Sequence, residues 1–470
     1  MLFNSLTFLV FFAVVLPVFL LMKDWKWQKY FLLAASYVFY AAWHPPYTII
    51  LFASTLLDWY LARRIAGAVS LSRRKVLLLI SLTANLGLLA TFKYADFLMA
   101  GFREVAQLAN VHYLPPDPGL LLPVGISFYT FASLSYTIDV YRREIRSDTS
   151  FTDYALFVSF FPHLVAGPIV RASYLLPQIA TPRRPTQDQI TWGLVLLILG
   201  IFCKAVLADS ILAPTVDAIY AAPESYPLRD VWLGVLAFSG QIFYDFSGYS
   251  LCAIGIALCF GFSFPDNFHF PYAAAGFTDF WRRWHISLST WLRDYLYVPL
   301  GGNRHGSAKT YRNLMLTMLI GGLWHGASWM FVIWGALHGI YLAIERWWQR
   351  RPGTRPASGR VSSLYVLFTF LVVTLTWIPF RASSMASVAE VFQGLFGPGA
   401  GLTLDAMTRL LCVLVMVLTL VGQFKLRSSS LEQFFATLRF PVQVLMVALA
   451  LIAIFLCSGG DERAFIYFQF

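Results

Sequence analysis

The chain has 470 residues, of which 58% are hydrophobic, 17% aromatic and only 13% charged, whereas an ordinary soluble domain is about 25% charged. So few ionisable side chains cannot cover a globule of this size, which excludes a water-soluble monomer. The net charge of +11 would suit nucleic-acid binding only if the basic residues formed one exposed stripe, but they interrupt apolar runs. We therefore expect an integral membrane protein surrounded by lipid, with no nucleic-acid partner.

Ten apolar segments are long enough, or nearly long enough, to cross a bilayer, which takes about 20 helical residues. The first contains no Lys or Arg, and its apolar run is longer than the hydrophobic region of a typical signal peptide, so we expect a membrane span there. We predict an all-α polytopic protein with about ten spanning helices plus re-entrant or interfacial helices, in one integral-membrane domain over residues 1–470. The predicted spans are 2–22, 30–43, 47–62, 76–92, 119–139, 190–207, 231–260, 364–380, 407–424 and 440–457.

The basic residues indicate an orientation, because short cytoplasmic loops are enriched in Lys and Arg. Ten crossings with both termini extracytoplasmic place six basic connections on the cytoplasmic side, and these hold 25 of the 35 Lys and Arg residues. The opposite connections are poor in basic residues and carry acidic ones. The six basic connections are 23–29, 63–75, 142–146, 171–184, 282–312 and 346–360.

Three stretches, 151–168, 280–300 and 311–345, fit neither a span nor a plain loop. The third begins with 14 residues (311–324), about 21 Å as a helix, which is too short to cross about 30 Å of hydrocarbon. A turn at Gly326 and Ala327 would then place irregular backbone at membrane depth, which is tolerated only inside protein or beside a water-filled cavity. We therefore predict a cavity inside the membrane at this turn.

His325 follows Trp324 at this turn. An ionisable residue among apolar neighbours at membrane depth is costly, which makes it a functional candidate. A neutral imidazole can take a proton from a hydroxyl or thiol and return it to a leaving group. The alternative is a structural histidine that hydrogen-bonds helix backbones. His338 lies about 220° further around an ideal helix, so no shared face is expected.

Aromatic residues, with His285 among them, recur at helical three- and four-residue spacing over 280–297. The pattern predicts one amphipathic helix at the membrane boundary, with Thr278 or Asp279 as its N-cap. Basic side chains elsewhere around this helix either contact anionic lipid or clamp the phosphates of an anionic donor, and the sequence does not separate these two roles. They are Arg282, Arg283 and Arg293.

Asp245 follows Tyr244 in the middle of a long predicted span. A carboxylate in hydrocarbon is unfavourable unless it is paired or hydrated, so Asp245 should face the protein interior. It either orients a catalytic histidine or ties helices together, and the second role is favoured because polar residues commonly link membrane helices. His163, beside Pro162, is expected to be structural. No HExxH, CxxC or carboxylate cluster occurs, so no metal site is predicted.

Several of these segments, taken in order, resemble the membrane-bound O-acyltransferase family and, within it, the bacterial alginate O-acetyltransferase branch. Each alone is a weak signal, but together they cover most of the chain between Leu122 and Trp334, within a motif-bearing core of about 120–345. One difference is that Leu251 follows Ser250 where branch members often have aspartate. The segments are 122–131, 163–171, 244–249, 280–302, 322–329 and the tail 465–470.

The resemblance implies a helical bundle in which a cytoplasmic and an extracytoplasmic funnel meet near the family's histidine, here His325, with His285 matching a second family histidine. It implies acetyl transfer from cytoplasmic acetyl-CoA toward an extracytoplasmic, alginate-like polysaccharide at the bacterial inner membrane. A periplasmic acetyltransferase usually completes the transfer, and no permanently bound cofactor is implied. Trp324, Tyr244 and Asp245 join the arginines as candidates for substrate or donor binding.

In the expected reaction His325 removes the acceptor's proton, and His285 stabilises the developing oxyanion or orients the thioester carbonyl. Two alternatives stay open at this point. One is D-alanyl or other acyl transfer to a different cell-envelope polymer. The other is a non-enzymatic transporter of a lipid-linked sugar, although the sequence lacks the paired interrupted helices expected of one.

Overall fold

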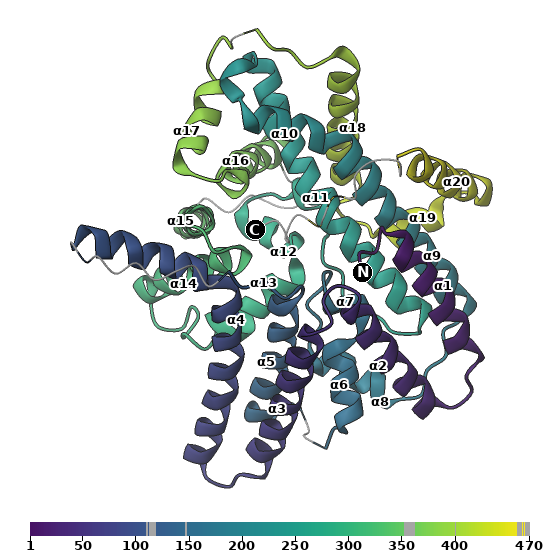
Figure 1. Cartoon of the computed structure of the whole chain (residues 1–470). Helices are drawn as coiled ribbons and strands as arrows, with labels where there is room; N and C mark the ends of the chain where they lie inside the picture. Colours follow the sequence, from purple (N-terminus) through teal and green to yellow (C-terminus); the bar gives the residue numbers. More distant parts are fainter. Residues whose placement is uncertain are drawn as a thin grey trace. The chain divides into compact units, whose positions relative to one another are not determined.

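The computed structural model describes residues 1–109, 111, 119–145, 148–351, 362–399, 401–457, 463 and 465. Over these residues all regular secondary structure is helical (Figure 1), as the apolar runs predict. The internal contacts divide the chain into two compact units: unit 1 is Met1–Leu196 with Ala253–Pro265, and unit 2 is Leu197–Cys252 with Asp266–Phe470. The single domain over 1–470 stays a prediction.

Unit 1 has an aromatic core and a buried polar link between helices. The ring of Phe161 packs edge-on against Phe11 at a centroid distance of 5.3 Å. The carboxylate of Asp58 accepts hydrogen bonds from Ser81 Oγ (2.6 Å) and Asn85 Nδ2 (2.9 Å), which joins α3 to α4. The helices are α1 (Leu6–Leu21), α2 (Trp25–Ala41), α3 (Tyr47–Gly67), α4 (Leu71–Leu108), α5 (Ile126–Arg142), α6 (Phe151–Ser159), α7 (Phe161–Leu164), α8 (Ala172–Ala180) and most of α9 (Gln187–Ile201).

Unit 2 contains the segments that carry the candidate site residues other than His163. Its α-helices are α10 (Ala213–Ala221), most of α11 (Leu228–Cys259), α12 (Phe277–Arg283), α13 (Ile286–Leu292), α14 (Ser307–His325), α15 (Trp329–Gln349), α16 (Ser363–Arg381), α17 (Met385–Gly394), α18 (Ala406–Leu426), α19 (Leu431–Thr437) and α20 (Phe440–Cys457). Two π-helices, η1 (Phe202–Leu212) and η4 (Arg293–Tyr297), and two short 3₁₀ turns, η2 (Pro223–Ser225) and η3 (Pro271–Ala273), complete it.

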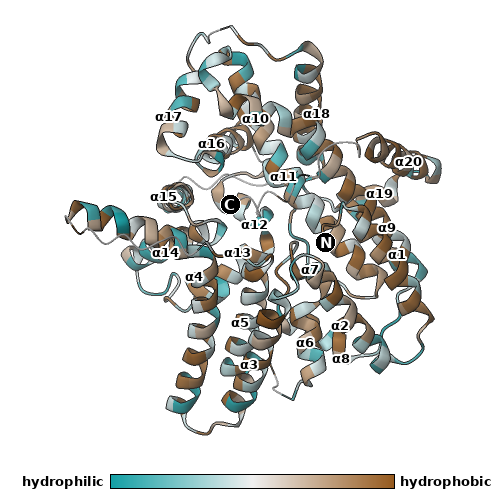
Figure 2. Cartoon of the chain, in the orientation of Figure 1, coloured by the Kyte–Doolittle hydropathy of each residue, from teal (hydrophilic) through white to brown (hydrophobic). Residues whose placement is uncertain are grey.

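Each of the ten predicted spans overlaps a helix, although α5 begins at Ile126, seven residues into the predicted span 119–139. Six helical stretches of the described chain are long and apolar enough to cross a membrane, which confirms a polytopic membrane protein. Figure 2 shows α20 hydrophobic along its length, and only Ala450 of this helix is buried, as expected for contact with lipid. Crossing by α1, α2, α3 and α5 stays a prediction. The six are Leu71–Leu108, Gln187–Ala221, Leu228–Cys259, Ser363–Arg381, Ala406–Leu426 and Phe440–Cys457.

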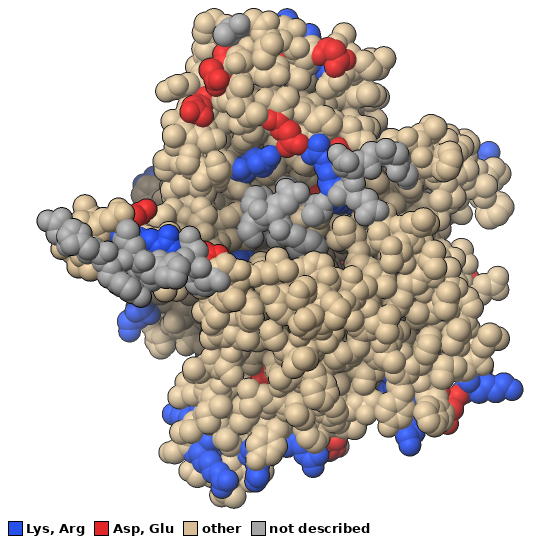
Figure 3. Space-filling model, viewed as in Figure 1, with Lys and Arg blue, Asp and Glu red and all other residues tan. Residues whose placement is uncertain are grey.

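Basic side chains gather at the end of the α3–α4 hairpin, where Figure 3 shows blue atoms beyond a largely uncharged surface. This end contains the basic connection 63–75. Such a division between charged loop and uncharged helix surface is typical of a membrane boundary. Arg146 and residues 352–360 of two other basic connections lie outside the described residues. The extracytoplasmic location of the termini stays a prediction.

The turn predicted at Gly326 and Ala327 is confirmed, since α14 ends at His325 and α15 begins at Trp329. The predicted length of the first helix is wrong. Helix α14 starts at Ser307 and has 19 residues, which is about 28 Å. Its polar first turns hid this start from an estimate based on apolar residues. Length alone therefore does not place the turn partway through the membrane, and the intramembrane cavity stays a prediction.

The single amphipathic helix predicted for 280–297 is wrong, because α12, α13 and η4 divide this segment. His285 separates α12 from α13 with φ of +43°, a left-handed conformation that costs roughly 1–2 kcal/mol for a residue with a Cβ. The predicted N-cap is also wrong: Gly276 precedes α12, whereas Thr278 and Asp279 lie inside it. A regular three- and four-residue spacing does not reveal such a break.

Candidate active site

His325 is the last residue of α14 and is only 2% exposed. Three aromatic rings surround its imidazole, with centroid distances of 5.0 Å to Trp334, 5.1 Å to Trp324 and 5.4 Å to Phe380. The ring planes meet at 70° to 84°, the edge-to-face arrangement that aromatic pairs prefer. The imidazole is therefore held in a packed aromatic environment.

A close contact between backbones fixes the helix that carries His325. A Cβ atom on Gly335 of α15 would lie 2.4 Å from the carbonyl oxygen of Met318 on α14. A Cβ atom on Gly322 of α14 would lie 2.2 Å from the carbonyl oxygen of Phe331. Only glycine at these two positions permits this approach, as at the small-residue contacts of membrane helix pairs. His325 lies three residues beyond Gly322, so this contact sets its position against Trp334.

His285 lies beside His325 in unit 2, with 6.2 Å between their ring centroids. It is fully buried, and its ring is 5.7 Å from Trp324 and 4.5 Å from Phe246. Neither ring nitrogen has a hydrogen-bond partner among the described residues. Burial lowers the pKa of His285 to about 3, so this imidazole is neutral near pH 7. A neutral imidazole can still donate one hydrogen bond.

Hydrogen bonds hold the unusual backbone turn at His285. The N–H of Ile286 donates to the Asn267 carbonyl oxygen at 2.9 Å. The side-chain oxygen of Asn267 accepts from Ser287 Oγ (2.8 Å) and from the Ser287 N–H (3.3 Å). Asn267 Nδ2 in turn donates to Ser250 Oγ on α11 at 3.0 Å. Asn267 thus ties the turn that carries His285 to another helix.

A third histidine, His338 on α15, packs against the same tryptophan as His325. Its ring is 4.8 Å from Trp334 and 5.1 Å from Trp281, and it is fully buried. This proximity was not predicted from one ideal helix, because His325 and His338 lie on two separate helices. We call the three histidines, together with Trp281, Trp284, Trp324, Trp334 and Trp377, the histidine–tryptophan cluster.

Asp245 is buried on α11, as predicted, and forms an ion pair with Lys204 of η1. The Lys204 amine also lies 2.9 Å from a carboxylate oxygen of Asp209. This pairing supports the helix-linking role predicted for Asp245. Sequence reasoning missed Lys204, although a single lysine within the apolar run 196–208 is costly for the same reason as Asp245 and signals a buried partner. The π-helical turn brings Lys204 and Asp209 together.

The other predicted donor-binding residues lie in varied surroundings. The Tyr244 hydroxyl is 2.6 Å from Thr419 Oγ1, which links α11 to α18. Arg283 pairs with Asp279 at 2.9 Å and donates to the carbonyl oxygen of Arg427. The remaining two arginines are exposed: Arg282, and Arg293, whose charge is paired with Asp294 at 2.7 Å. Their role toward a donor stays a prediction.

Two segments that carry the family resemblance, around His163 and Phe465, place these residues among buried aromatic side chains. His163 lies in unit 1, buried among phenylalanines such as Phe264, at a ring distance of 5.5 Å. Phe465 of the C-terminal tail is fully buried in unit 2 and packs on Tyr249 at 4.5 Å. Residues 466–470 of this tail lie outside the described residues.

The described chain is an all-helical membrane protein with two adjacent buried histidines, and comparison with known families identifies its class. The model of the MBOAT family, the membrane-bound O-acyltransferases, matches residues 76–384, which include both His285 and His325. The chain belongs to this family and is an O-acyltransferase.

Three relatives are similar over most of their length. A protein named probable alginate O-acetylase from Pseudomonas putida is 39% identical over 499 residues, which cover 100% of both chains. One of the same name from Pseudomonas aeruginosa is 41% identical over 403 residues, 85% of this chain and 75% of the relative. A peptidoglycan O-acetyltransferase from Helicobacter pylori is 37% identical over 404 residues, 80% of this chain and 75% of the relative.

Proposed function

We propose that this enzyme moves an acetyl group from cytoplasmic acetyl-CoA toward an extracytoplasmic, alginate-like polysaccharide, with His325 as the base. The observation that carries the proposal is the adjacency of His325 and His285, 6.2 Å apart and enclosed by aromatic rings. Two of the relatives described above are named alginate O-acetylases, and one of them aligns over the whole chain. Membership of an acyltransferase family argues against the transporter alternative.

The proposed reaction balances with His325 as a proton carrier. The oxygen of the acceptor hydroxyl attacks the thioester carbonyl carbon, and the imidazole of His325 takes the proton of this hydroxyl. A tetrahedral oxyanion forms, and the neutral imidazole of His285 donates a hydrogen bond to it. The carbon–sulfur bond then breaks, and the thiol of coenzyme A leaves with the proton held on His325. The products are the acetyl ester and free coenzyme A, and the histidine returns to its neutral form.

Both substrates must reach histidines that are 0% and 2% exposed. Because side chains such as Trp324 and Phe380 enclose His325, admission of the thioester requires these rings to move. On the donor side, Arg282 is the exposed arginine that we assign to the phosphates of coenzyme A. Arg283 and Arg293 already pair with carboxylates and contribute less net charge. A periplasmic acetyltransferase would complete the transfer to polysaccharide.

The experiment replaces His325 by Gln and by Ala and measures acetyl groups on envelope polysaccharide by mass spectrometry. We expect acetylation to fall at least a hundredfold, the usual contribution of a general base, with unchanged protein abundance in the membrane. His305→Gln is the matched control, because His305 is an exposed histidine in the same unit. Undiminished acetylation in both His325 variants would remove His325 from the mechanism. Transfer of D-alanine instead of acetate would appear in the same spectra.

A further inference from the structure

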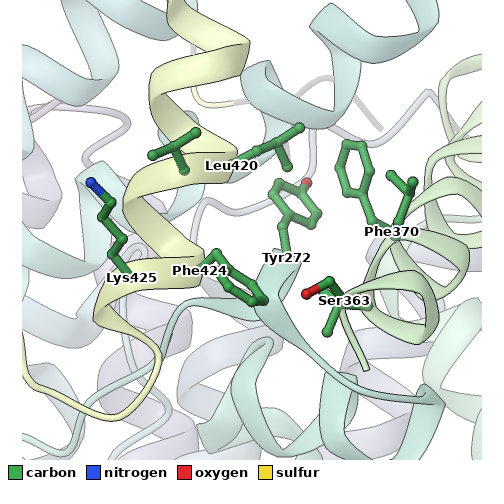
Figure 4. A pocket seen from close by; sticks show the side chains of 9 residues that line it. Tyr272, Ser363, Phe370, Leu420, Phe424 and Lys425 are labelled. Atoms are coloured by element: carbon green, nitrogen blue, oxygen red, sulfur yellow. The ribbon is translucent and has the colours of Figure 1, made fainter. Parts of the chain in front are cut away.

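Unit 2 contains a pocket of about 290 Å³ between α16 and α18, away from the residues used in the proposed reaction. Figure 4 shows the aromatic rings of Phe370, Phe424 and Tyr272 around it, with Ser363 on one side and Lys425 on the other. Apart from these last two residues, the lining is aliphatic or aromatic. A pocket with an apolar body and little polar lining suits a hydrocarbon chain better than a sugar or a nucleotide.

The helices on both sides of this pocket are long and apolar enough to span a membrane. Lining residues of both helices are exposed: Leu367 by 50%, Val421 by 47% and Phe424 by 41%. Exposed apolar side chains on spanning helices are covered by lipid tails in a bilayer. The pocket therefore opens toward lipid, and an acyl chain is the group that can enter it.

The polar residues of the pocket lie at helix ends. Ser363 is the first residue of α16, at the positive end of its dipole, and Lys425 lies in the last turn of α18. Lys425 is exposed and forms no ion pair with any residue that the structure describes. A flexible lysine at the edge of an apolar surface extends its amine toward headgroups. Positive charge at the polar end thus complements an anionic headgroup.

We propose that the α16–α18 pocket binds one acyl chain of an anionic phospholipid from the surrounding bilayer, with its phosphate toward Lys425 at the end of α18. The site is independent of the acyl-transfer chemistry. Its inner wall is nevertheless close to the candidate site, because Tyr272 contacts Trp284 of the histidine–tryptophan cluster at 6.2 Å. The bound acyl chain packs against Tyr272, which in turn contacts Trp284 of this cluster.

The test uses the full-length protein in nanodiscs of phosphatidylethanolamine with and without phosphatidylglycerol. Retained lipid is counted by native mass spectrometry after mild delipidation. We expect wild type to retain one phosphatidylglycerol in preference to phosphatidylethanolamine. Val421→Trp fills the pocket and should abolish this retention. Lys425→Gln should reduce the preference about fivefold, the effect of one lysine near an anionic surface.

Matched controls are Leu418→Trp, an exposed position outside the pocket on the same helix, and Lys309→Gln, an exposed lysine elsewhere in unit 2. Both should retain lipid as wild type does, and all variants must elute as monodisperse protein. Equal retention of the two lipids by wild type would overturn the proposal, as would full retention in Val421→Trp. A change in self-association instead of lipid retention would identify a second copy as the occupant and would also overturn it.

Discussion

Asn267 and Ser287 are joined by two hydrogen bonds, and this pairing holds the turn that presents His285. Asn267 is 18 residues from His285 along the chain. Its carboxamide connects the turn to Ser250 on α11. The orientation of His285 therefore depends on a polar residue outside α12 and α13, which makes Asn267 a positioning residue.

Replacing Asn267 by Leu should lower acetyl transfer about a hundredfold, because a displacement of about 1 Å at a reacting group has an effect of that size. Asn267→Asp retains the oxygen that accepts from Ser287, so it should recover part of the activity. In Asn267→Leu the kcat should fall by a larger factor than the KM for acetyl-CoA changes, as measured with purified enzyme. A Leu variant that folds normally and keeps its kcat would show that this turn needs no such support.

Lys204→Met should destabilise the protein strongly, because it removes the amine that pairs with the buried carboxylate of Asp245 and with the half-buried carboxylate of Asp209. Breaking a buried ion pair by removing one member costs about 3–5 kcal/mol. The thermal midpoint in detergent measures this loss, and the double variant Lys204→Met/Asp245→Leu should recover part of it. Arg293→Met, which breaks the exposed pair with Asp294, should cost less than about 1 kcal/mol. Equal effects of the buried and the exposed substitution would contradict this assignment.

Gly335→Ala should separate α14 from α15, because its methyl group would lie 2.4 Å from the Met318 carbonyl oxygen. Overpacking of this kind costs about 1–3 kcal/mol. The variant should show a lower thermal midpoint and reduced acetylation, since His325 moves with α14. The control is Gly422→Ala on α18, where a Cβ meets nothing within 4 Å, and where alanine should be neutral or stabilising. Equal thermal midpoints and equal acetylation in the two variants would show that the close contact at Gly335 does not stabilise the α14–α15 pair.

Stability should depend on pH through His285. Burial lowers the pKa of His285 from 6.5 to about 3, so between these values the unfolded chain binds a proton that the folded chain does not. The free energy of unfolding therefore falls as the pH drops from 6.5 toward 3, by about 2 kcal/mol at pH 5 from this residue. The thermal midpoint of wild type should decline more steeply than that of His285→Gln over this range. The exposed His305→Gln should decline as wild type does, and parallel curves for all three proteins would refute the prediction.

The apolar helices and the turn after His325 could be predicted from the sequence, because long apolar runs and the pair Gly326-Ala327 are local signals. The interior location of Asp245 followed from the cost of a charge in hydrocarbon. Its partner Lys204 is 41 residues away, and only the same cost applied to both charges could have suggested the pair. The local sequence pattern around each residue did not show that Lys204 and Asp245 form an ion pair.

The break at His285 could not be predicted, because the aromatic spacing continues across it. Tertiary hydrogen bonds that Ile286 and Ser287 donate to Asn267 hold the left-handed backbone there, and no local pattern encodes them. The proximity of His338 to Trp334 likewise depends on how two helices pack. Helix α14 was underestimated because its polar first turns resemble a loop by composition.

The contact of Gly322 with α15 involves main-chain atoms on both helices, so exchanging side chains elsewhere leaves it intact. The aromatic groups enclosing His325 differ in this respect, because they contact its imidazole through their side-chain rings. An evolving enzyme can therefore reshape these walls to admit a different acceptor while its proton carrier keeps the same place. The position of the proton carrier and the shape of the aromatic walls around it can therefore change independently of each other.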